Sequence, residues 1–596
     1  MSAHQTRRDL LGTVGLFVGA GTLGALSASA TPTVEHLLAT PDHPLATREA
    51  DEDSFTRETV EIESFDGTII EATYYEPVPE GPHPSILGTH GWAQERADLD
   101  DVAAVYATEG YAGLIYDSRG FGDSGGQVTL TGDAERRDAS ALIDWLAERD
   151  EIISDGENNP RVGLDGGSYG GGIQTRLAAE DDRVDALVPR FTWFDLVQTL
   201  VPNGVLRAGW VRGLLSAGQL EGDLDPEFEE RGLRVIETGE LTADDVGYFQ
   251  SRSAVAYDGP NAPTLVIQEF NDRLFPADEG IDIYEWARDN GDEAVMILGN
   301  GTTHNIWGES PPGSNAFDDV AADAALAWLD DHLKDEGNHE LPPVTYYNEA
   351  TDEFVEAAEW PPETTTERTY ERTVEQATLT DPETDLFSVD FFLTRETELV
   401  GTPTLSVGVE PTGEGRTHLM AALQHVSDDG VTTIKDQVMP YTVSEATTIE
   451  FDLATIQWTI PAGGSLRVAL SIGSEPVTAV DWPLGGGLFA DSDEDAELSI
   501  SGTLELTVPV TEGEEEIAIP PIAEEFDPPQ DLDGDGLYED VTGTGDPAPT
   551  IADVQALFEN LDSDVVTEHA GAFNFSSSNP ERVTVFDVQA LFSRIA

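Results

Sequence analysis

The sequence of 596 residues contains no cysteine, which excludes disulfide bonds and thiolate metal sites. Basic residues are also scarce, because 29 lysines and arginines face 116 aspartates and glutamates, for a net charge of -87. Only two of the basic residues are lysines, Lys334 and Lys435. Nucleic acid is a poor partner for such a chain, since its phosphates are bound by clustered positive charge.

The excess of acid indicates an environment of high salt. In dilute buffer so large a charge repels itself, whereas at molar salt the Debye length falls to about 3 Å and the acidic groups mainly keep the surface hydrated. The alternative is an acidic patch for a basic ligand, but the acidic residues are spread over the whole chain. The composition is typical of an extremely halophilic archaeon.

Long apolar runs are absent except near the N-terminus, where a glycine-rich run is shorter than the roughly 20 residues of a membrane span. Thr6-Arg7-Arg8-Asp9-Leu10-Leu11 resembles a twin-arginine motif, and Ala28-Ser29-Ala30 offers a cleavage site. We therefore expect residues 1–30 to be a twin-arginine signal peptide and the protein to be secreted or held at the cell surface after export in the folded state. An uncleaved anchor is the alternative, and no other segment could cross a bilayer.

The rest of the chain divides by its hydrophobic pattern, and its length suggests several domains. Strands that alternate with helices predict a mostly parallel sheet covered on both faces, the α/β-hydrolase layout. Short alternating strands without helices predict a β-sandwich of the jelly-roll kind. The expected parts are a flexible leader at 31–57, a catalytic domain at 58–340, a jelly roll at 341–510, a linker at 511–530 and a small helical module at 531–596.

An apolar and aromatic segment, about residues 193–258, interrupts the catalytic domain between two predicted strands. It is expected to form a helical cap that excludes water and shapes the pocket for an acyl group. A plain surface insertion is the alternative.

The candidate nucleophile is Ser168. A short apolar strand, 162–164, leads into Gly166-Gly167-Ser168-Tyr169-Gly170 and then directly into a helical pattern. This is the sequence of a nucleophile elbow, in which glycines allow a very tight turn and expose the serine hydroxyl. Ser124 lies in a second G-x-S-x-G match, but no helix follows it and no suitable His and Asp precede it.

A serine nucleophile needs a base and an acid, which follow it in the order acid, then histidine, in α/β-hydrolases. Asp272 is the candidate acid because it follows the predicted strand 264–268 and precedes a helix that begins near Pro276. Glu269 and Asp278 are the rivals.

His304 is the candidate base because it lies in a glycine-rich loop after the last predicted strand of the domain, whereas His332 and His339 lie on or beyond the terminal helix. The developing oxyanion needs two donors. The expected donors are the backbone N–H groups of Tyr169, after the nucleophile, and of Trp92, in the loop after the third strand.

The tail contains an internal repeat, since the segment from Asp540 through Asp553 matches the segment from Asn574 through Asp587 without a gap. Before it, Asp531, Asp533 and Asp535 alternate as the ligands of a calcium loop do, with a glycine at the sixth position. The match is partial, because Thr542 stands where a bidentate Glu closes such a loop. Calcium is the expected ligand, and a solvated acidic turn is the alternative.

Residues 58–510 resemble the cocaine esterase and Xaa-Pro dipeptidyl-peptidase group of serine hydrolases. The resemblance rests on Gly-Gly-Ser-Tyr-Gly-Gly around Ser168, on Asp-Ser-Arg-Gly-Phe-Gly-Asp-Ser-Gly from Asp117 and on Asn-Asp-Arg-Leu-Phe-Pro around Asp272. It implies hydrolysis of esters, or of peptides after an N-terminal Xaa-Pro, through an acyl-enzyme and without a metal or other catalytic cofactor. Cocaine esterase-like members donate to the oxyanion from a tyrosine hydroxyl where this chain has Trp92.

The tail resembles a dockerin-type module, which implies attachment to another surface protein. Within the hydrolase interpretation, ester and Xaa-Pro substrates both stay open, because a dipeptidyl-peptidase needs a carboxylate for the free amine and the cap offers Asp195, Glu221 and Asp223. The competing hypothesis is a cell-surface binding protein that uses the jelly roll and the tail on an inert hydrolase scaffold, and the complete set of Ser, Asp and His speaks against it.

Overall fold

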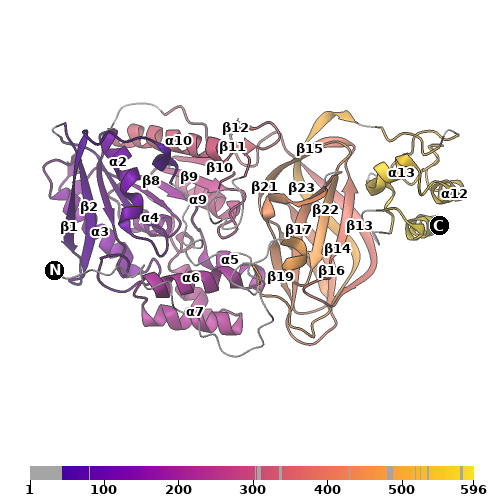
Figure 1. Ribbon diagram of the computed structural model, residues 1–596, viewed down its shortest axis with the longest axis horizontal. Coiled ribbons are helices and arrows are strands. Elements are labelled where there is room, and N and C mark those ends of the chain that lie inside the picture. The colour runs from indigo at the N-terminus through magenta and orange to yellow at the C-terminus, as the bar shows by residue number, and fades with distance from the viewer. Residues whose placement is uncertain are drawn as a thin grey trace, which may run out of the picture. The chain divides into compact units, whose positions relative to one another are not determined.

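A ten-stranded sheet organises the first half of the chain in the computed structural model (Figure 1). The structure describes residues 43–79, 81–301, 304, 311–334, 339–427, 430–478, 487–516, 518–523, 525–532, 536–576 and 582–595. The predicted signal peptide lies outside these residues. None of the helices within them is long and apolar enough to cross a membrane.

The strand order is β1-β2-β4-β3-β7-β8-β9-β10-β11-β12, parallel from β4 to β11 and antiparallel at both edges. The strands are β1 (Phe55–Glu63), β2 (Ile69–Pro77), β3 (Ser85–Thr89), β4 (Ala112–Tyr116), β7 (Val162–Gly167), β8 (Val184–Arg190), β9 (Thr264–Glu269), β10 (Ala294–Gly299), β11 (Val344–Asn348) and β12 (Glu353–Ala357). A separate hairpin is formed by β5 (Ser154–Gly156) and β6 (Asn159–Pro160).

Helices cover both faces of this sheet, because its central strands are apolar on both sides. One face is covered by α2 (Asp100–Thr108) and α10 (Ser314–Lys334). The other is covered by α3 (Asp133–Ala147), α4 (Tyr169–Glu180) and α9 (Ala277–Asn290). This confirms the predicted α/β layout.

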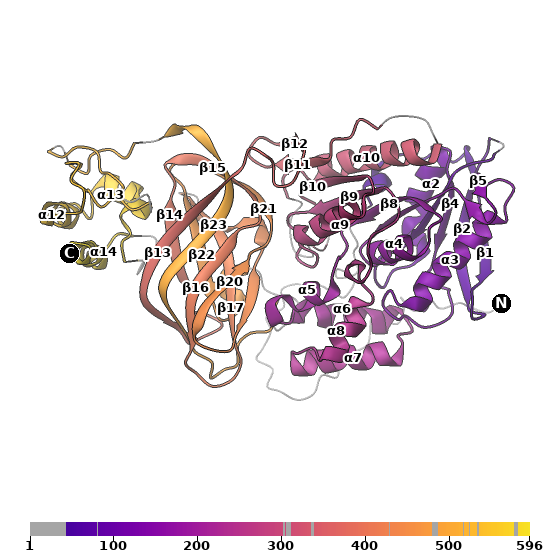
Figure 2. The same ribbon diagram turned by 180° about the vertical axis from the view of Figure 1, so that it is seen from behind.

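The segment between β8 and β9 is helical, as predicted for the cap. It contains α5 (Leu196–Leu200), α6 (Ala208–Glu221), α7 (Pro226–Thr238) and α8 (Ala243–Gln250), with short turns η4 (Pro202–Gly204) and η5 (Ala254–Ala256) (Figure 2). The buried Glu279 of α9 fixes the start of the cap, because its carboxylate accepts hydrogen bonds from the backbone N–H groups of Phe194 and Asp195.

The prediction that residues 31–57 form a flexible leader is wrong for residues 43–57, the part of it that the structure describes. The turn η2 (Pro44–Thr47) places Leu45 in the core between α2 and α10, and β1 already begins at Phe55. The side chain of His43 contacts Arg190 and Asp165 beneath the elbow strand. A single apolar residue in a polar, acidic stretch is too weak a signal to predict this packing.

The Arg190–Asp165 pair is a buried ion pair, with the guanidinium Nη2 2.5 Å from the carboxylate Oδ1 and both side chains almost fully enclosed. We expect Arg190→Met to lower the free energy of unfolding by about 3–5 kcal/mol, because it leaves the buried carboxylate of Asp165 without its guanidinium partner. Urea unfolding in molar KCl measures the change. The control is Arg48→Met, which removes an exposed pair with Asp323 and should cost about 1 kcal/mol or less. Equal losses in the two variants would contradict this account.

The second half of the chain forms two antiparallel sheets that share one apolar core, as expected of a β-sandwich. One sheet contains β13 (Thr366–Leu379), β15 (Arg395–Gly401), β16 (Thr404–Pro411), β20 (Thr447–Asp452), β21 (Ile456–Ile460) and β23 (Leu498–Glu516). The other contains β14 (Phe387–Phe392), β17 (Thr417–Ser427), β18 (Gly430–Thr433), β19 (Met439–Val443) and β22 (Ser465–Ser471), and α11 (Glu475–Thr478) follows β22. The jelly-roll topology stays a prediction.

Two predicted boundaries of this domain need correction. β11 and β12 belong to the hydrolase sheet, because β11 pairs in parallel with β10, so the β domain begins after residue 357 rather than at 341. Part of the predicted linker at 511–530 instead belongs to the β domain and to the core of the tail. β23 continues to Glu516, and Ile519 and Ile522 are buried in the core of the tail.

The tail is built from two matching helices, α12 (Ile551–Glu559) and α14 (Val585–Ser593), with α13 (Asp564–Glu568) and the turn η7 (Ala570–Phe573) between them. Each helix starts with the same capping box, formed by Thr550 with Asp553 and by Thr584 with Asp587. These contacts confirm the internal repeat. Of the predicted calcium ligands, Asp533 and Asp535 lie outside the described residues, and Asp531 accepts the backbone N–H of Gly536 at 2.9 Å.

Candidate active site

Ser168 occupies the sharp turn between β7 and α4, with a φ of 52°. A positive φ is rare for a residue with a side chain and indicates a turn held by its surroundings. Space around the turn is tight. A Cβ on Gly170 would lie 2.3 Å from the carbonyl oxygen of Thr89, and one on Gly166 would lie 2.8 Å from the side chain of Gln174. The sequence prediction of an elbow therefore holds in its backbone geometry.

The structure brings together the three residues predicted to act as nucleophile, base and acid. The Oγ of Ser168 lies 3.1 Å from Nε2 of His304, and Nδ1 of the same imidazole lies 2.7 Å from Oδ2 of Asp272. The other carboxylate oxygen of Asp272 accepts the backbone N–H groups of Leu274 and Phe275, each at 2.8 Å. The carboxylate is thus fixed on the side away from the imidazole. This arrangement can pass a proton from a hydroxyl to an imidazole whose tautomer is set by the acid.

Packing holds the imidazole of His304 in place. The ring of Phe275 lies edge-on at 5.0 Å between centroids, and the ring of Trp210 from α6 lies edge-on at 5.9 Å. Arg207, just before α6, donates to the carbonyl oxygens of Thr199 and of Arg273. Burial lowers the pKa of Arg207 to about 10. This value is still above neutral pH, so Arg207 stays a cation beside the acid. The cap and the acid loop are therefore joined at the site.

Two of the rival residues, Ser124 and Asp278, have structural roles. The hydroxyl of Ser124 donates to the carbonyl oxygen of Asp117 and accepts the backbone N–H of Glu71. Asp278 accepts both the backbone N–H and the hydroxyl of Thr455 in the β domain. Neither contacts the imidazole of His304 in the described contacts.

The two residues predicted to supply the oxyanion donors line the same pocket as Ser168. Tyr169 is the first residue of α4, where backbone N–H groups are free of helical partners. Trp92 lies in the turn after β3, and its indole packs edge-on against the ring of Tyr169 at 5.2 Å. The indole Nε1 donates to the carbonyl oxygen of Leu214 in α6 instead of pointing to Ser168. Donation by the two backbone N–H groups stays a prediction.

Sequence analysis missed a contribution from the β domain. The turn η6 (Ile434–Asp436), between β18 and β19, reaches the acid loop. The side-chain amide of Gln437 donates to the carbonyl oxygens of Phe270 at 3.0 Å and of Asp272 at 2.7 Å. The buried Lys435 donates to the side chain of Asn300, in the loop that leads to His304, at 2.9 Å. The rarity of lysine in this chain was the one signal that singled out this position.

We expect Gln437→Leu to lower kcat about ten- to a hundredfold with little change in KM, because a shift of the acid by a fraction of an ångström misaligns the relay. Steady-state kinetics on a soluble ester measure kcat and KM separately and so test this expectation. Gln424→Leu is the matched control, because Gln424 is a buried glutamine of the same domain whose amide donates to Thr433 instead of the acid loop. Equal losses in both variants would show general destabilisation and contradict the positioning role.

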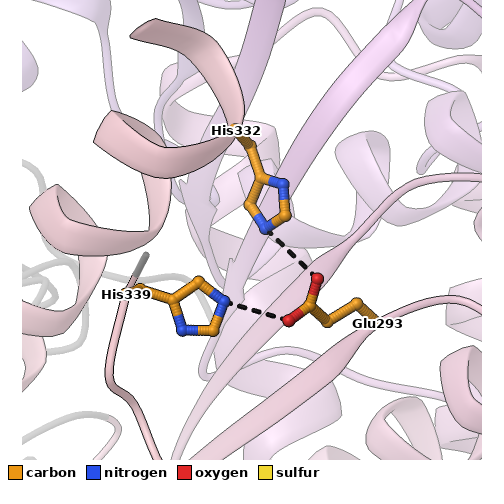
Figure 3. Close-up of side chains that lie close together, drawn as sticks. All are labelled: Glu293, His332 and His339. Carbon is orange, nitrogen blue, oxygen red and sulfur yellow. Dashed lines mark hydrogen bonds and ion pairs between the residues drawn. The ribbon is translucent and has the colours of Figure 1, made fainter. Parts of the chain in front are cut away.

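One further group of described side chains has the geometry to hold a metal ion. Ligand atoms of Glu293, His332 and His339 all lie within 4.8 Å of one another (Figure 3). The imidazole of His339 lies 3.1 Å from a carboxylate oxygen of Glu293, and both imidazoles pack against Trp328. His332 lies near the end of α10, His339 follows that helix in the chain, and Glu293 directly precedes β10. None of them contacts Ser168, Asp272 or His304 in the described structure.

Comparison with known proteins supports a hydrolase. Residues 66–305 match the family described as X-Pro dipeptidyl-peptidase (S15 family). An uncharacterized 31.7 kDa protein from the traX-finO intergenic region of Escherichia coli is 38% identical over 122 residues, which are 20% of this chain and 41% of that protein. The chain thus spans about two fifths of the length of this curated relative.

Solved structures share the fold at low sequence identity. A CocE/NonD family hydrolase from Staphylococcus aureus superimposes with a TM-score of 0.60 at 14% identity, covering 76% of this chain and 94% of that one. An alpha-amino acid ester hydrolase gives a TM-score of 0.58 at 14% identity, with 78% and 98% covered. The chain therefore has a CocE/NonD-like α/β-hydrolase fold with a β-rich C-terminal region. Together, the family match and this fold support a serine hydrolase of the esterase or peptidase type.

Proposed function

We propose that the protein hydrolyses acyl bonds through an acyl-enzyme on Ser168, with His304 as general base and Asp272 as the acid that orients it. The observation that carries this proposal is the continuous relay of two hydrogen-bond distances, 3.1 Å and 2.7 Å, from hydroxyl to imidazole to carboxylate. Esters are the first candidate substrate. The family match over residues 66–305 favours peptides with an N-terminal Xaa-Pro as the second.

The reaction has two halves. In the first, Oγ of Ser168 attacks the carbonyl carbon, its proton moves to Nε2 of His304, and the imidazolium then protonates the leaving alcohol or amine as the bond to the acyl carbon breaks. In the second, water takes the place of the leaving group, gives a proton to the same nitrogen and attacks the acyl carbon, after which Ser168 recovers its proton and the carboxylic acid leaves. Asp272 stays ionised throughout and stabilises the imidazolium.

A fluorophosphonate probe tests the nucleophile directly. We expect it to label the protein in molar KCl with one adduct, located at Ser168 by peptide mapping, and we expect Ser168→Ala to abolish the labelling. p-Nitrophenyl acetate and Gly-Pro-p-nitroanilide, assayed side by side, then separate ester from dipeptidyl-peptidase activity. Folded protein that is neither labelled nor active on either substrate would refute the proposal and favour the binding-protein hypothesis.

The roles of the two ends of the chain belong to the same proposal. Export as a folded protein rests on the twin-arginine-like sequence of residues 1–30. Attachment through the tail is supported by apolar side chains that are exposed at matching positions of its two helices, Ile551 with Val585 and Phe558 with Phe592. Calcium binding by the tail rests on the sequence of its acidic loop.

A further inference from the structure

An apolar pocket opens beside Ser168 and extends into the cap. It encloses about 810 Å³ of space free of protein atoms, part of which is open to solvent. The pocket is lined by Ser168 and by Leu274 and Phe275 of the acid loop. Val201, Val211 and Val235 line it from the cap. Apart from Ser168, every side chain that lines it is aliphatic or aromatic.

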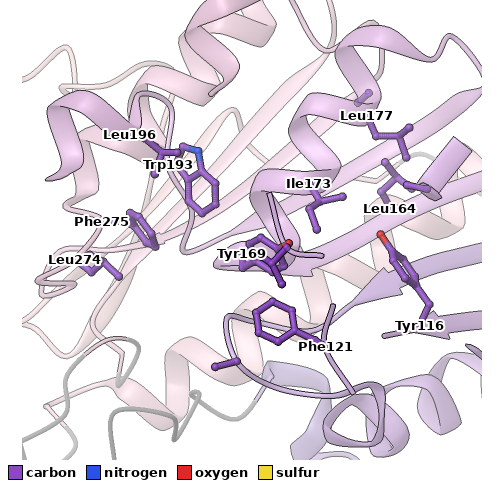
Figure 4. Packing of buried hydrophobic residues seen from close by; sticks show 14 of the residues in the cluster. Tyr116, Phe121, Leu164, Tyr169, Ile173, Leu177, Trp193, Leu196, Leu274 and Phe275 are labelled. Carbon is purple, nitrogen blue, oxygen red and sulfur yellow. The ribbon is translucent and has the colours of Figure 1, made fainter. Parts of the chain in front are cut away.

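The aromatic residues of the pocket direct their polar atoms elsewhere. The indole nitrogen of Trp92 donates to Leu214, and that of Trp193 donates to the carbonyl oxygen of Arg252. The hydroxyl of Tyr169 lies 3.3 Å from that of Ser118. Figure 4 shows the rings of Trp193 and Phe275 side by side near the start of α4, and their centroids are 5.4 Å apart. Ser168 therefore supplies the polar group at the end of an otherwise apolar chamber.

Among the described residues that line the pocket, none carries the charge that a peptide substrate would need. A free amino terminus must be held by a carboxylate when it is taken out of water. Of the cap carboxylates that sequence analysis considered, Asp195 caps α5 and accepts from Gln250, and Asp223 lies near Gln127. Neither of these, nor Glu221, lines the pocket in the described structure. The chamber thus suits an alkyl chain and disfavours the ammonium group of a dipeptidyl substrate.

The position of His304 indicates whether the acyl half or the leaving-group half of the substrate enters the pocket. The leaving group and the attacking water both exchange protons with Nε2 of this imidazole, so both must be on its side of Ser168. His304 is not among the residues that line the pocket, whereas Ser168 is. The pocket therefore faces the acyl half of the substrate.

We propose that this pocket binds the alkyl chain of fatty-acid esters. The proposal rests on the acyl-enzyme chemistry proposed above and adds the substrate class to it. The apolar wall gains contact with each methylene that leaves water, which lowers the free energy of the transition state as the chain grows.

The test is a series of p-nitrophenyl esters from acetate through butyrate and hexanoate to octanoate. We expect kcat/KM to rise about three- to fourfold per methylene until the pocket is filled, since each buried methylene contributes about 0.8 kcal/mol. Val235→Trp, which fills the chamber from α7, should remove at least tenfold of the preference for octanoate over acetate, measured as the ratio of the two kcat/KM values.

Leu233→Trp is the matched control, because Leu233 lies on the same helix but is 50% exposed, and it should keep the wild-type profile. Val211→Phe, from α6, repeats the test if the first variant does not fold by circular dichroism. Labelling by a fluorophosphonate and hydrolysis of acetate with a flat chain-length profile would overturn the pocket assignment alone. Absence of labelling and of all ester hydrolysis would instead overturn the proposed function.

Discussion

Replacing Ser168 by alanine is expected to lower kcat on a p-nitrophenyl ester by about a millionfold, because the loss of a serine nucleophile stops formation of the acyl-enzyme. The fold should persist, since the strained turn is held by its glycines and by the backbone around Thr89 rather than by the hydroxyl. Single-turnover kinetics at high enzyme concentration are needed to measure so small a residual rate.

Ser124→Ala is the matched control for this variant. Both serines lie in G-x-S-x-G sequences, but the hydroxyl of Ser124 bonds only to the backbone of Asp117 and Glu71 in the described contacts. We expect its kcat to stay within a few-fold of wild type and its stability to fall by about 1 kcal/mol. A large loss of activity in Ser124→Ala together with an active Ser168→Ala would reverse the assignment of the nucleophile.

Asp272→Asn is expected to lower kcat by about ten-thousandfold, as in serine hydrolases where this change leaves the imidazole in the wrong tautomer. An amide that donates to Nδ1 of His304 forces the proton onto Nε2, which can then no longer accept from Ser168. With its nitrogen toward His304, the amide still offers its one oxygen to the N–H groups of Leu274 and Phe275, so the loop should keep its conformation.

Asp278→Asn provides the comparison for the acid. Its carboxylate accepts from Thr455 in the β domain, and the change should cost stability without a comparable loss of kcat. Thermal unfolding and steady-state kinetics on both variants separate the two effects. A greater loss of kcat in the Asp278 variant than in the Asp272 variant would contradict the proposed relay.

Local signals were enough to predict the centre of the site. The elbow around Ser168 has a short-range cause, because the tight turn and its glycines are contiguous in the sequence. Asp272 and His304 each follow a buried strand, and parallel strands bring their carboxyl ends to one edge of a sheet. The order of strand and helix therefore places both residues near the serine without knowledge of their contacts.

Long-range contacts were beyond the same reasoning. The strand β13 escaped prediction because its buried face carries Arg372 between Tyr370 and Val374, and because a bulge after Val374 breaks the alternation. Gln437 looks like any polar residue of a turn, and its role depends on the packing of one domain against another. No local pattern encodes which backbone carbonyl groups it meets.

The course of β23 through the β domain has a consequence for synthesis of the protein. This strand pairs with β13, β15 and β16, and it is formed by residues 498–516, after every strand it joins. The domain that holds Gln437 against the acid loop therefore cannot close while the ribosome is still translating the earlier part. A nascent chain that stops before residue 498 would already contain Ser168, Asp272 and His304, yet full alignment of the acid loop would wait for the strand formed by residues 498–516.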